Sequence, residues 1–142
     1  MNLGGDLAIK DNLSQSLVHI AAKNGFDSIL VYLCMEKGVN YLDADVNKRN
    51  SLHLAALESQ VNTGILLTIW IKENHPESLN DKDCSGSTAM HYAASSQCYK
   101  IVRNLLIVGA DINIADDKGD TALDIAKSRK DDPIIQLLVW FI

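Results

Sequence analysis

A segment of about ten residues recurs four times along the chain, and this repetition constrains the fold more than any other feature. The copies begin at Ser16, Asn50, Thr88 and Thr121, and they read SLVHIAAKNG, NSLHLAALES, TAMHYAASSQ and TALDIAKSRK. Histidine occupies the fourth position of the first three copies, and Asp124 occupies it in the last. Self-similarity at a spacing near 33 residues indicates stacked supersecondary units, each burying its apolar face against its neighbours.

A second motif comes after each copy and predicts a second helix in every unit. These motifs begin at Ile29, Ile65, Ile101 and Ile134. Their apolar residues stand at i, i+1, i+4 and i+5, which is the stripe of an amphipathic helix. The four opening residues of the first segments are good N-caps for a first helix. Each unit is therefore expected to contain a turn, a short helix, a second helix and a loop.

The turns complete a pattern that resembles the ankyrin repeat. The residues from Asp83 to Ala94 read DCSGSTAMHYAA, and apolar pairs and Gly109-Ala110-Asp111 come after them at the family's spacing. The resemblance covers the whole chain. It implies an all-α fold, an ankyrin-repeat solenoid of stacked helix pairs joined by β-hairpin-type turns. The expected units are approximately 11–44, 45–82, 83–115 and 116–142, and residues 1–10 are expected to be the tail of a preceding repeat.

Several departures from the family pattern carry expectations of their own. Repeat one has one extra residue before Gly38, and repeat two has about five, expected to be divided between 59–64 and 72–78. Lys48 stands where the turn glycine is expected, so the shape of the hairpin of repeat two is not specified by the family pattern. The missing first helix pair and the apolar ending, from Leu137 to Ile142, predict that the intact protein continues beyond this segment.

Composition narrows the function classes. The formal net charge is −5, without a basic block, which makes nucleic acid a poor partner. The three cysteines form no CxxC pair, and a reducing, cytoplasmic location fits best. No stretch reaches the length of a membrane span. We therefore expect no cofactor, no metal, no small-molecule substrate and no membrane contact except through segments outside this chain.

The residues that could carry chemistry have structural explanations. His19, His53 and His91 occupy the same repeat position, and each ring is expected to bond the backbone of a neighbouring turn rather than a shared zinc ion. A hydrolase built on Cys84 or Cys98 would need a base within hydrogen-bond reach, and the nearby His91 serves the repeat. The aspartates of the last repeat lack the spacing of a calcium loop and predict a solvated acidic edge. We expect no enzymatic activity from this segment.

By resemblance, the chain is a protein–protein interaction module that binds a protein or peptide through the hairpin tips and the concave face of the first helices. Arg49, Leu13 and Leu57 are expected to contribute most, because an arginine or an exposed leucine gains most on burial. Replacement of Arg49 by alanine is expected to weaken binding at an unchanged melting temperature. The implied partner-binding residues are Lys10, Asn12, Leu13, Gln15, Lys23, Asn24, Val46, Asn47, Arg49, Leu57, Glu58, Lys82, Cys84, Ser85, Ser87, Ser95, Ser96, Asp117, Lys118, Asp120, Ser128 and Arg129.

An alternative places the array inside a larger protein. Repeats three and four resemble those that precede the membrane region of ankyrin-containing palmitoyltransferases. The segment would then be the regulatory or substrate-recruiting region of a membrane enzyme, or of a channel, on the cytosolic face of the membrane. A transmembrane pair and a Cys-rich segment encoded downstream would favour this alternative.

Overall fold

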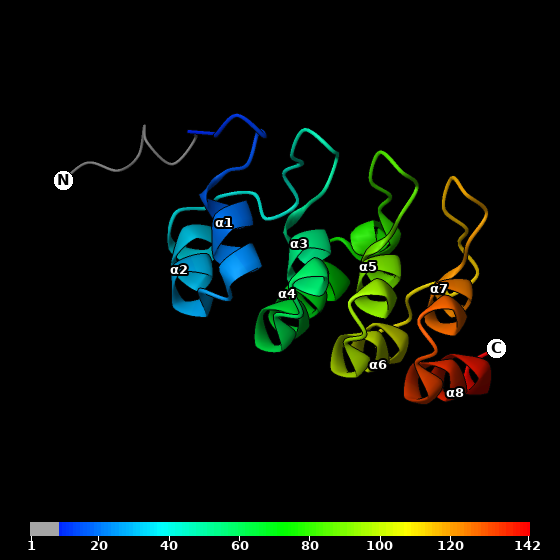
Figure 1. Ribbon diagram of the computed structural model, residues 1–142. Helices are drawn as coiled ribbons and strands as arrows, with labels where there is room; N and C mark the ends of the chain where they lie inside the picture. Colours follow the sequence, from blue (N-terminus) through cyan, green and yellow to red (C-terminus); the bar gives the residue numbers. More distant parts are fainter. Residues whose placement is uncertain (1–8) are drawn as a thin grey trace.

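The computed structural model describes residues 9–142, which form four successive helix pairs without a β-strand (Figure 1). The expected tail of a preceding repeat, residues 1–10, lies almost entirely outside the described residues. Pair one consists of α1 (Leu17–Asn24) and α2 (Asp27–Val31), which continues into the π-helical turn η2 (Tyr32–Glu36). Pair two consists of α3 (Ser51–Leu57) and α4 (Val61–Asn74), followed by the 3₁₀ turn η3 (Pro76–Asn80). Pair three is α5 (Ala89–Ser95) and α6 (Tyr99–Ile107), and pair four is α7 (Ala122–Ser128) and α8 (Asp132–Trp140).

The pairs stack into a solenoid, as the repetition predicts. The first helices form one row in which α1 packs on α3, α3 on α5 and α5 on α7, and the second helices α4, α6 and α8 form a parallel row. The fully buried alanine pairs Ala21-Ala22, Ala55-Ala56 and Ala93-Ala94 lie in the first row. Small side chains let these helices approach closely, and the larger Leu67, Ile101, Leu105 and Ile134 fill the interior of the second row.

The four first helices begin alike. The backbone N–H of each cap donates to the side chain three residues later. The acceptor is histidine Nδ1, at 3.1 Å, for Ser16, Asn50 and Thr88, and Asp124 Oδ2, at 3.0 Å, for Thr121. The exchange satisfies a donor that the helix itself leaves unpaired. All four predicted N-caps are therefore confirmed.

All the inserted residues of repeat two lie at the C-terminal end of its second helix and just after it. In every repeat the cap lies eleven residues before the first residue of the second helix, as in Asn50 and Val61 or Thr88 and Tyr99. The expectation that part of the insertion falls within 59–64 is therefore wrong. The extra residues instead lengthen α4 to 14 residues, against nine in α6, and form η3.

The single extra residue of repeat one is absorbed differently. It lies in η2, where α2 changes to i→i+5 hydrogen bonding, as in Lys37 N to Tyr32 O. A π-helical turn takes one additional residue into a helix without displacing the adjoining loop. Gly38 then ends the helix with a φ of 64°, as expected of a left-handed residue.

No helix among residues 9–142 has the length and the apolar character that crossing a bilayer requires.

Candidate partner-binding surface

The loops that precede the first helices are hairpins with a common internal structure. In each, an aspartate closes the turn by accepting two backbone N–H groups with its Oδ1, and the ends are joined by one backbone hydrogen bond. Asp83 Oδ1, for example, accepts from Ser85 N and Ser87 N at 2.9 Å, while Asp83 N donates to Ser87 O at 2.9 Å. Asp11, Asp45 and Asp116 make the same bonds.

The hairpin of repeat two has the same shape as the others despite its lysine. Lys48 adopts a φ of 60°, and Gly86 and Gly119 hold the same place at 78° and 85°. A left-handed conformation is strained for a residue with a Cβ and unstrained for glycine. The turn bonds from Asp45 are therefore strong enough to impose this conformation on Lys48.

Backbone hydrogen bonds connect each hairpin tip to the next. Val46 N donates to Leu13 O, Cys84 N to Asn47 O and Asp117 N to Ser85 O, all at 2.9 Å. The loops accordingly project side by side from the row of first helices (Figure 1). Residues from four separate stretches of the sequence thus form one continuous edge.

The repeated histidines hold the first helices to these hairpins. Because the cap N–H donates to Nδ1, the other ring nitrogen carries the proton and donates. Nε2 of His19, His53 and His91 lies 2.9 Å from the carbonyl oxygens of Arg49, Asp81 and Asp120 respectively. This confirms the structural role predicted for the three rings. Burial lowers the pKa of His53, so the neutral form is favoured there.

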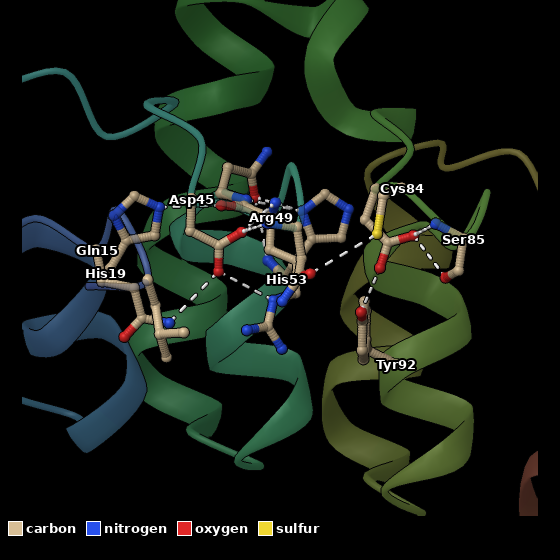
Figure 2. A network of polar contacts seen from close by, with 12 residues as sticks. Gln15, His19, Asp45, Arg49, His53, Cys84, Ser85 and Tyr92 are labelled. Carbon is tan, nitrogen blue, oxygen red and sulfur yellow. Dashed lines mark hydrogen bonds and ion pairs between the residues drawn. The ribbon is translucent and has the colours of Figure 1, made fainter. Parts of the chain in front are cut away.

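The junction between pairs one and two is closed by a buried ion pair (Figure 2). Arg49 Nε lies 3.0 Å from Asp45 Oδ2, and the two side chains are 17% and 0% exposed. Gln15 Nε2 donates to the same oxygen at 3.4 Å. Burial opposes ionisation of Asp45, but the bonds from Arg49 and Gln15 and the nearby guanidinium outweigh it and lower its pKa.

The junction between pairs two and three is closed by a tyrosine. The hydroxyl of Tyr92 donates to Asp83 Oδ2, and the Tyr92 ring meets His53 edge-on at a centroid distance of 5.7 Å (Figure 2). Burial of Asp83 opposes its ionisation, yet hydrogen bonds from Tyr92 and Ser85 lower its pKa. Burial, followed by the hydrogen bond to Asp83, raises the pKa of Tyr92.

The junction between pairs three and four is open. A groove of about 510 Å³ lies between α5, α7 and the last hairpin. Its lining residues are Ser87, His91, Tyr92, Ser95, Asp116, Lys118, Asp120, Asp124, Ile125, Ser128 and Arg129. At one end, Arg129 Nη2 donates to Ser95 Oγ at 3.2 Å.

Most of the predicted binding residues lie exposed or half-buried on this face. Gln15 is the exception, because it is 5% exposed and engaged with Asp45, so it is not part of the accessible surface. Arg49 and Leu57 are only partly accessible, and the ion pair of Arg49 with Asp45 argues against the expectation that replacing Arg49 leaves the melting temperature unchanged. Exposed are Lys10, Asn12, Leu13, Lys23, Asn24, Val46, Glu58, Lys82, Cys84, Ser85, Asp117, Lys118, Ser128 and Arg129, and half-buried are Asn47, Arg49, Leu57, Ser87, Ser95, Ser96 and Asp120.

The predicted binding residues omit five that line the groove, namely His91, Tyr92, Asp116, Asp124 and Ile125. Tyr92 and Ile125 come directly after the repeated His91 and Asp124. Tyr92 and Ile125 occupy the same position of the repeat, and this shared position could have marked both as candidates for the groove. Which of these positions faces an open groove depends on the size of the side chain, which a repeat pattern does not specify.

Among residues 9–142, no cysteine lies beside a base in the arrangement that a nucleophile would need. Burial raises the pKa of the half-buried Cys34 thiol to about 11, and Cys98 is buried. Cys84 is exposed on its hairpin tip, as expected, 3.9 Å from Asn47 Oδ1. Both ring nitrogens of His91 are engaged by Thr88 and Asp120. Within the described part of the chain, no three His, Cys, Asp or Glu side chains gather in a way that would hold a metal ion.

Comparison with known proteins gives matches along nearly the whole chain. A family described as ankyrin repeats (3 copies) matches residues 18–116 and 65–140. An ankyrin repeat protein of Rickettsia bellii is 32% identical over 130 residues, 92% of this chain and 70% of that protein. A transient receptor potential cation channel subfamily A member 1 homolog of Caenorhabditis elegans is 32% identical over 123 residues, and the nuclear factor NF-kappa-B p105 subunit of Mus musculus is 29% identical over 139. These cover 84% and 96% of this chain, which spans only 9% of the channel and 14% of the p105 subunit.

The family match and the relative from Rickettsia bellii agree with the stacked helix pairs, the linked hairpins and the repeated histidines. This chain belongs to the ankyrin-repeat family.

Proposed function

We propose that this chain is a non-catalytic, cytoplasmic module that binds a partner protein or peptide along its hairpin tips and the concave face of its first helices. Ankyrin repeats generally serve protein–protein interaction. The observation that carries the proposal is the set of backbone hydrogen bonds between successive tips, because it holds one surface, drawn from all four pairs, in a fixed register. A preorganised surface loses little conformational freedom on binding.

The surface also has the mixed character of an interaction face. Leu13 and Val46 expose 49% and 57% of their area at neighbouring tips, beside charged and hydroxyl side chains. Apolar anchors within a polar rim are typical of protein interfaces. The groove between α5 and α7 adds a concave region at the other end of the same face.

The test selects binders from a random twelve-residue peptide library displayed on phage, with the whole chain as bait. The peptides are then measured against Val46→Ser and Ile107→Ser, which remove aliphatic side chains of similar exposure, 57% and 60%. Ile107 lies on α6, in the row of second helices. We expect at least a fivefold loss of affinity for Val46→Ser and none for Ile107→Ser. Equal losses, or peptides affected only by Ile107→Ser, would contradict the proposed face.

A second candidate function is that of a regulatory or partner-recruiting region of a larger protein, such as a channel or a membrane palmitoyltransferase. It is favoured by the channel of Caenorhabditis elegans, which aligns with 84% of this chain but is far longer. Reading the gene on both sides of the segment tests it. Membrane spans encoded in the same frame would support this candidate, and stop codons at both ends would exclude it.

A further inference from the structure

The turn aspartates differ in what their second carboxylate oxygen contacts. Asp45 Oδ2 accepts from Arg49 Nε and Gln15 Nε2, and Asp83 Oδ2 accepts from the Tyr92 hydroxyl. Asp116 is the equivalent residue of the last hairpin, and its Oδ1 makes the usual two turn bonds at 2.9 Å. Within residues 9–142, no side chain donates to Asp116 Oδ2.

Two substitutions between repeats account for this difference. Asp120 lies four residues after Asp116, the place that Arg49 holds relative to Asp45. Ile125 lies nine residues after Asp116, the place that Tyr92 holds relative to Asp83. Neither the arginine nor the tyrosine of the earlier repeats has a counterpart in the last junction, and a second carboxylate stands where the arginine would be. The smaller isoleucine also leaves the space that appears as the groove.

The charges facing this groove are Asp116, Asp120, Asp124, Lys118 and Arg129. Asp124 Oδ2 is engaged by the cap of α7, and Arg129 is held by Ser95 at the far end. In the described part of the chain, none of the five takes part in an ion pair. Asp116 and Asp120 thus present neighbouring carboxylates in a concave, half-buried place, where the attraction for a cation is stronger than on an open surface.

We propose that this groove binds an arginine side chain of the partner, with its guanidinium on Asp116 and Asp120. The arginine would supply from outside what Arg49 supplies to Asp45 within the chain. Arginine suits the place better than lysine, because its planar fork serves two carboxylates at once and its aliphatic stem covers Ile125 and Tyr92. This inference rests on the proposed function and names the chemistry of its partner.

The experiment titrates the ¹⁵N-labelled full chain with N-acetyl-arginine methylamide and monitors amide chemical shifts. The citrulline analogue has the length of arginine without its charge, and the lysine analogue keeps the charge without the planar fork. We expect shifts confined to the last hairpin and the start of α7, weakening as salt is added. The citrulline analogue should bind at least fivefold more weakly, and the lysine analogue should lie between the two. Equal binding of citrulline and arginine would overturn the inference, as would shifts centred elsewhere on the molecule.

Three variants assign the effect to the groove. Asp120→Asn should weaken the binding of the arginine probe at least fivefold. Asp117→Asn removes the same charge from the exposed tip outside the groove lining and should leave binding within a factor of two. Asp120→Arg places an internal guanidinium where Arg49 stands in repeat two, and it should abolish probe binding while the chain remains folded. Equal losses for Asp117→Asn and Asp120→Asn would reduce the effect to general charge attraction and overturn the inference.

The same variants separate this inference from the proposed function. Peptides selected on the whole chain should be enriched in arginine, and Asp120→Asn should remove that enrichment. Selected peptides that bind the Val46 region and are indifferent to Asp120 would leave the proposed function standing and overturn the arginine site. Alternatively, the arginine probe binds but no selected peptide responds to Val46→Ser. That outcome would support the arginine site and contradict the proposed binding face along the hairpin tips.

Discussion

The buried carboxylate of Asp45 determines what Arg49 does in this molecule. The side chain of Asp45 is fully buried, and its charge is stabilised by the arginine, by Gln15 and by two backbone groups. A buried charge that loses a partner is costly, whereas an exposed arginine in a single hydrogen bond contributes little. Arg49 is therefore part of the structure as well as a candidate for contact with a partner.

Replacement of Arg49 by alanine is accordingly expected to lower the free energy of unfolding by about 1–3 kcal/mol, because Asp45 keeps its backbone donors and Gln15 but loses the guanidinium. Arg129→Ala is the matched control. Arg129 is exposed, and among residues 9–142 its side chain bonds only to Ser95 Oγ, so its loss should change stability by less than about 0.5 kcal/mol. Urea denaturation of the three proteins measures both values. Equal stabilities for the two variants would mean that the ion pair of Arg49 contributes nothing.

His53 predicts a dependence of stability on mild acid. Its ring is 2% exposed, and burial lowers its pKa below the ordinary value of 6.5. A group with a lowered pKa in the folded state stabilises the fold above the unfolded pKa, and that contribution is lost as the pH falls. The free energy of unfolding should therefore decrease from pH 7 to pH 5, with a slope of up to about 1.4 kcal/mol per pH unit from this one group.

The variant that tests this is His53→Gln, which should be less stable at pH 7 but lose less stability between pH 7 and pH 5. His75→Gln, which changes an exposed histidine, should retain the slope of the parent chain. Denaturation curves at several pH values give the slopes. A parent-like slope in His53→Gln would assign the effect to other groups.

At the scale of the elements, the hairpins join the separate repeats into one continuous surface, because each tip bonds to the next. The turn aspartate, the left-handed residue and the bond to the next tip recur even where the sequence departs from the pattern, as at Lys48. The caps, the helix order and the histidine roles were predictable because they depend on residues within one repeat. The position of the insertion was not, because the local pattern of apolar residues does not show whether extra residues precede α4 or extend its end.

The glycines of the last two hairpins offer a paired test of contact between elements. Gly86 and Gly119 both have a positive φ, so alanine is strained at either place. A Cβ at Gly86 would also lie 2.6 Å from Asp117 Oδ1 and 3.0 Å from Asp117 N, whereas one at Gly119 would meet nothing within 4 Å. We expect Gly119→Ala to cost about 1 kcal/mol and Gly86→Ala at least about 1 kcal/mol more. Thermal unfolding measures the stability lost in each variant. Equal losses would mean that the neighbouring hairpin moves away from the added Cβ at no cost in free energy.

At the scale of the whole molecule, the groove between α5 and α7 shows where prediction from sequence ends. Its existence depends on Tyr92 and Ile125, which come from different repeats and differ in size. The sequence of one repeat does not show whether a side chain elsewhere in the protein donates a hydrogen bond to the second carboxylate oxygen of its turn aspartate. The predicted binding surface included the buried Gln15 and omitted Asp116, whose surroundings are set by the neighbouring pair.

The stacking order makes a final prediction about how the molecule opens. In the described part of the chain, pair one packs on pair two alone, and Ile20, Phe26 and Ile29 are 37%, 49% and 51% exposed. Each pair of a solenoid is stabilised by its nearest neighbours, so pair one should unfold locally before pairs two and three, which have a neighbour on both sides. Leu33 and Leu105 are equivalent buried leucines, at 2% and 0% exposure, in pairs one and three.

Leu105→Ala is expected to lower the global free energy of unfolding by about 2–5 kcal/mol, because its cavity lies between two neighbouring pairs. Leu33→Ala should lower the free energy of hydrogen exchange by a similar amount in α1 and α2 only, leaving amides such as Val102 within about 0.5 kcal/mol of the parent chain. Amide exchange measured by NMR separates the two patterns. If Leu33→Ala lowers protection in α5 and α6 as much as in α1, the four pairs unfold as one cooperative unit and nearest-neighbour stacking does not describe this molecule.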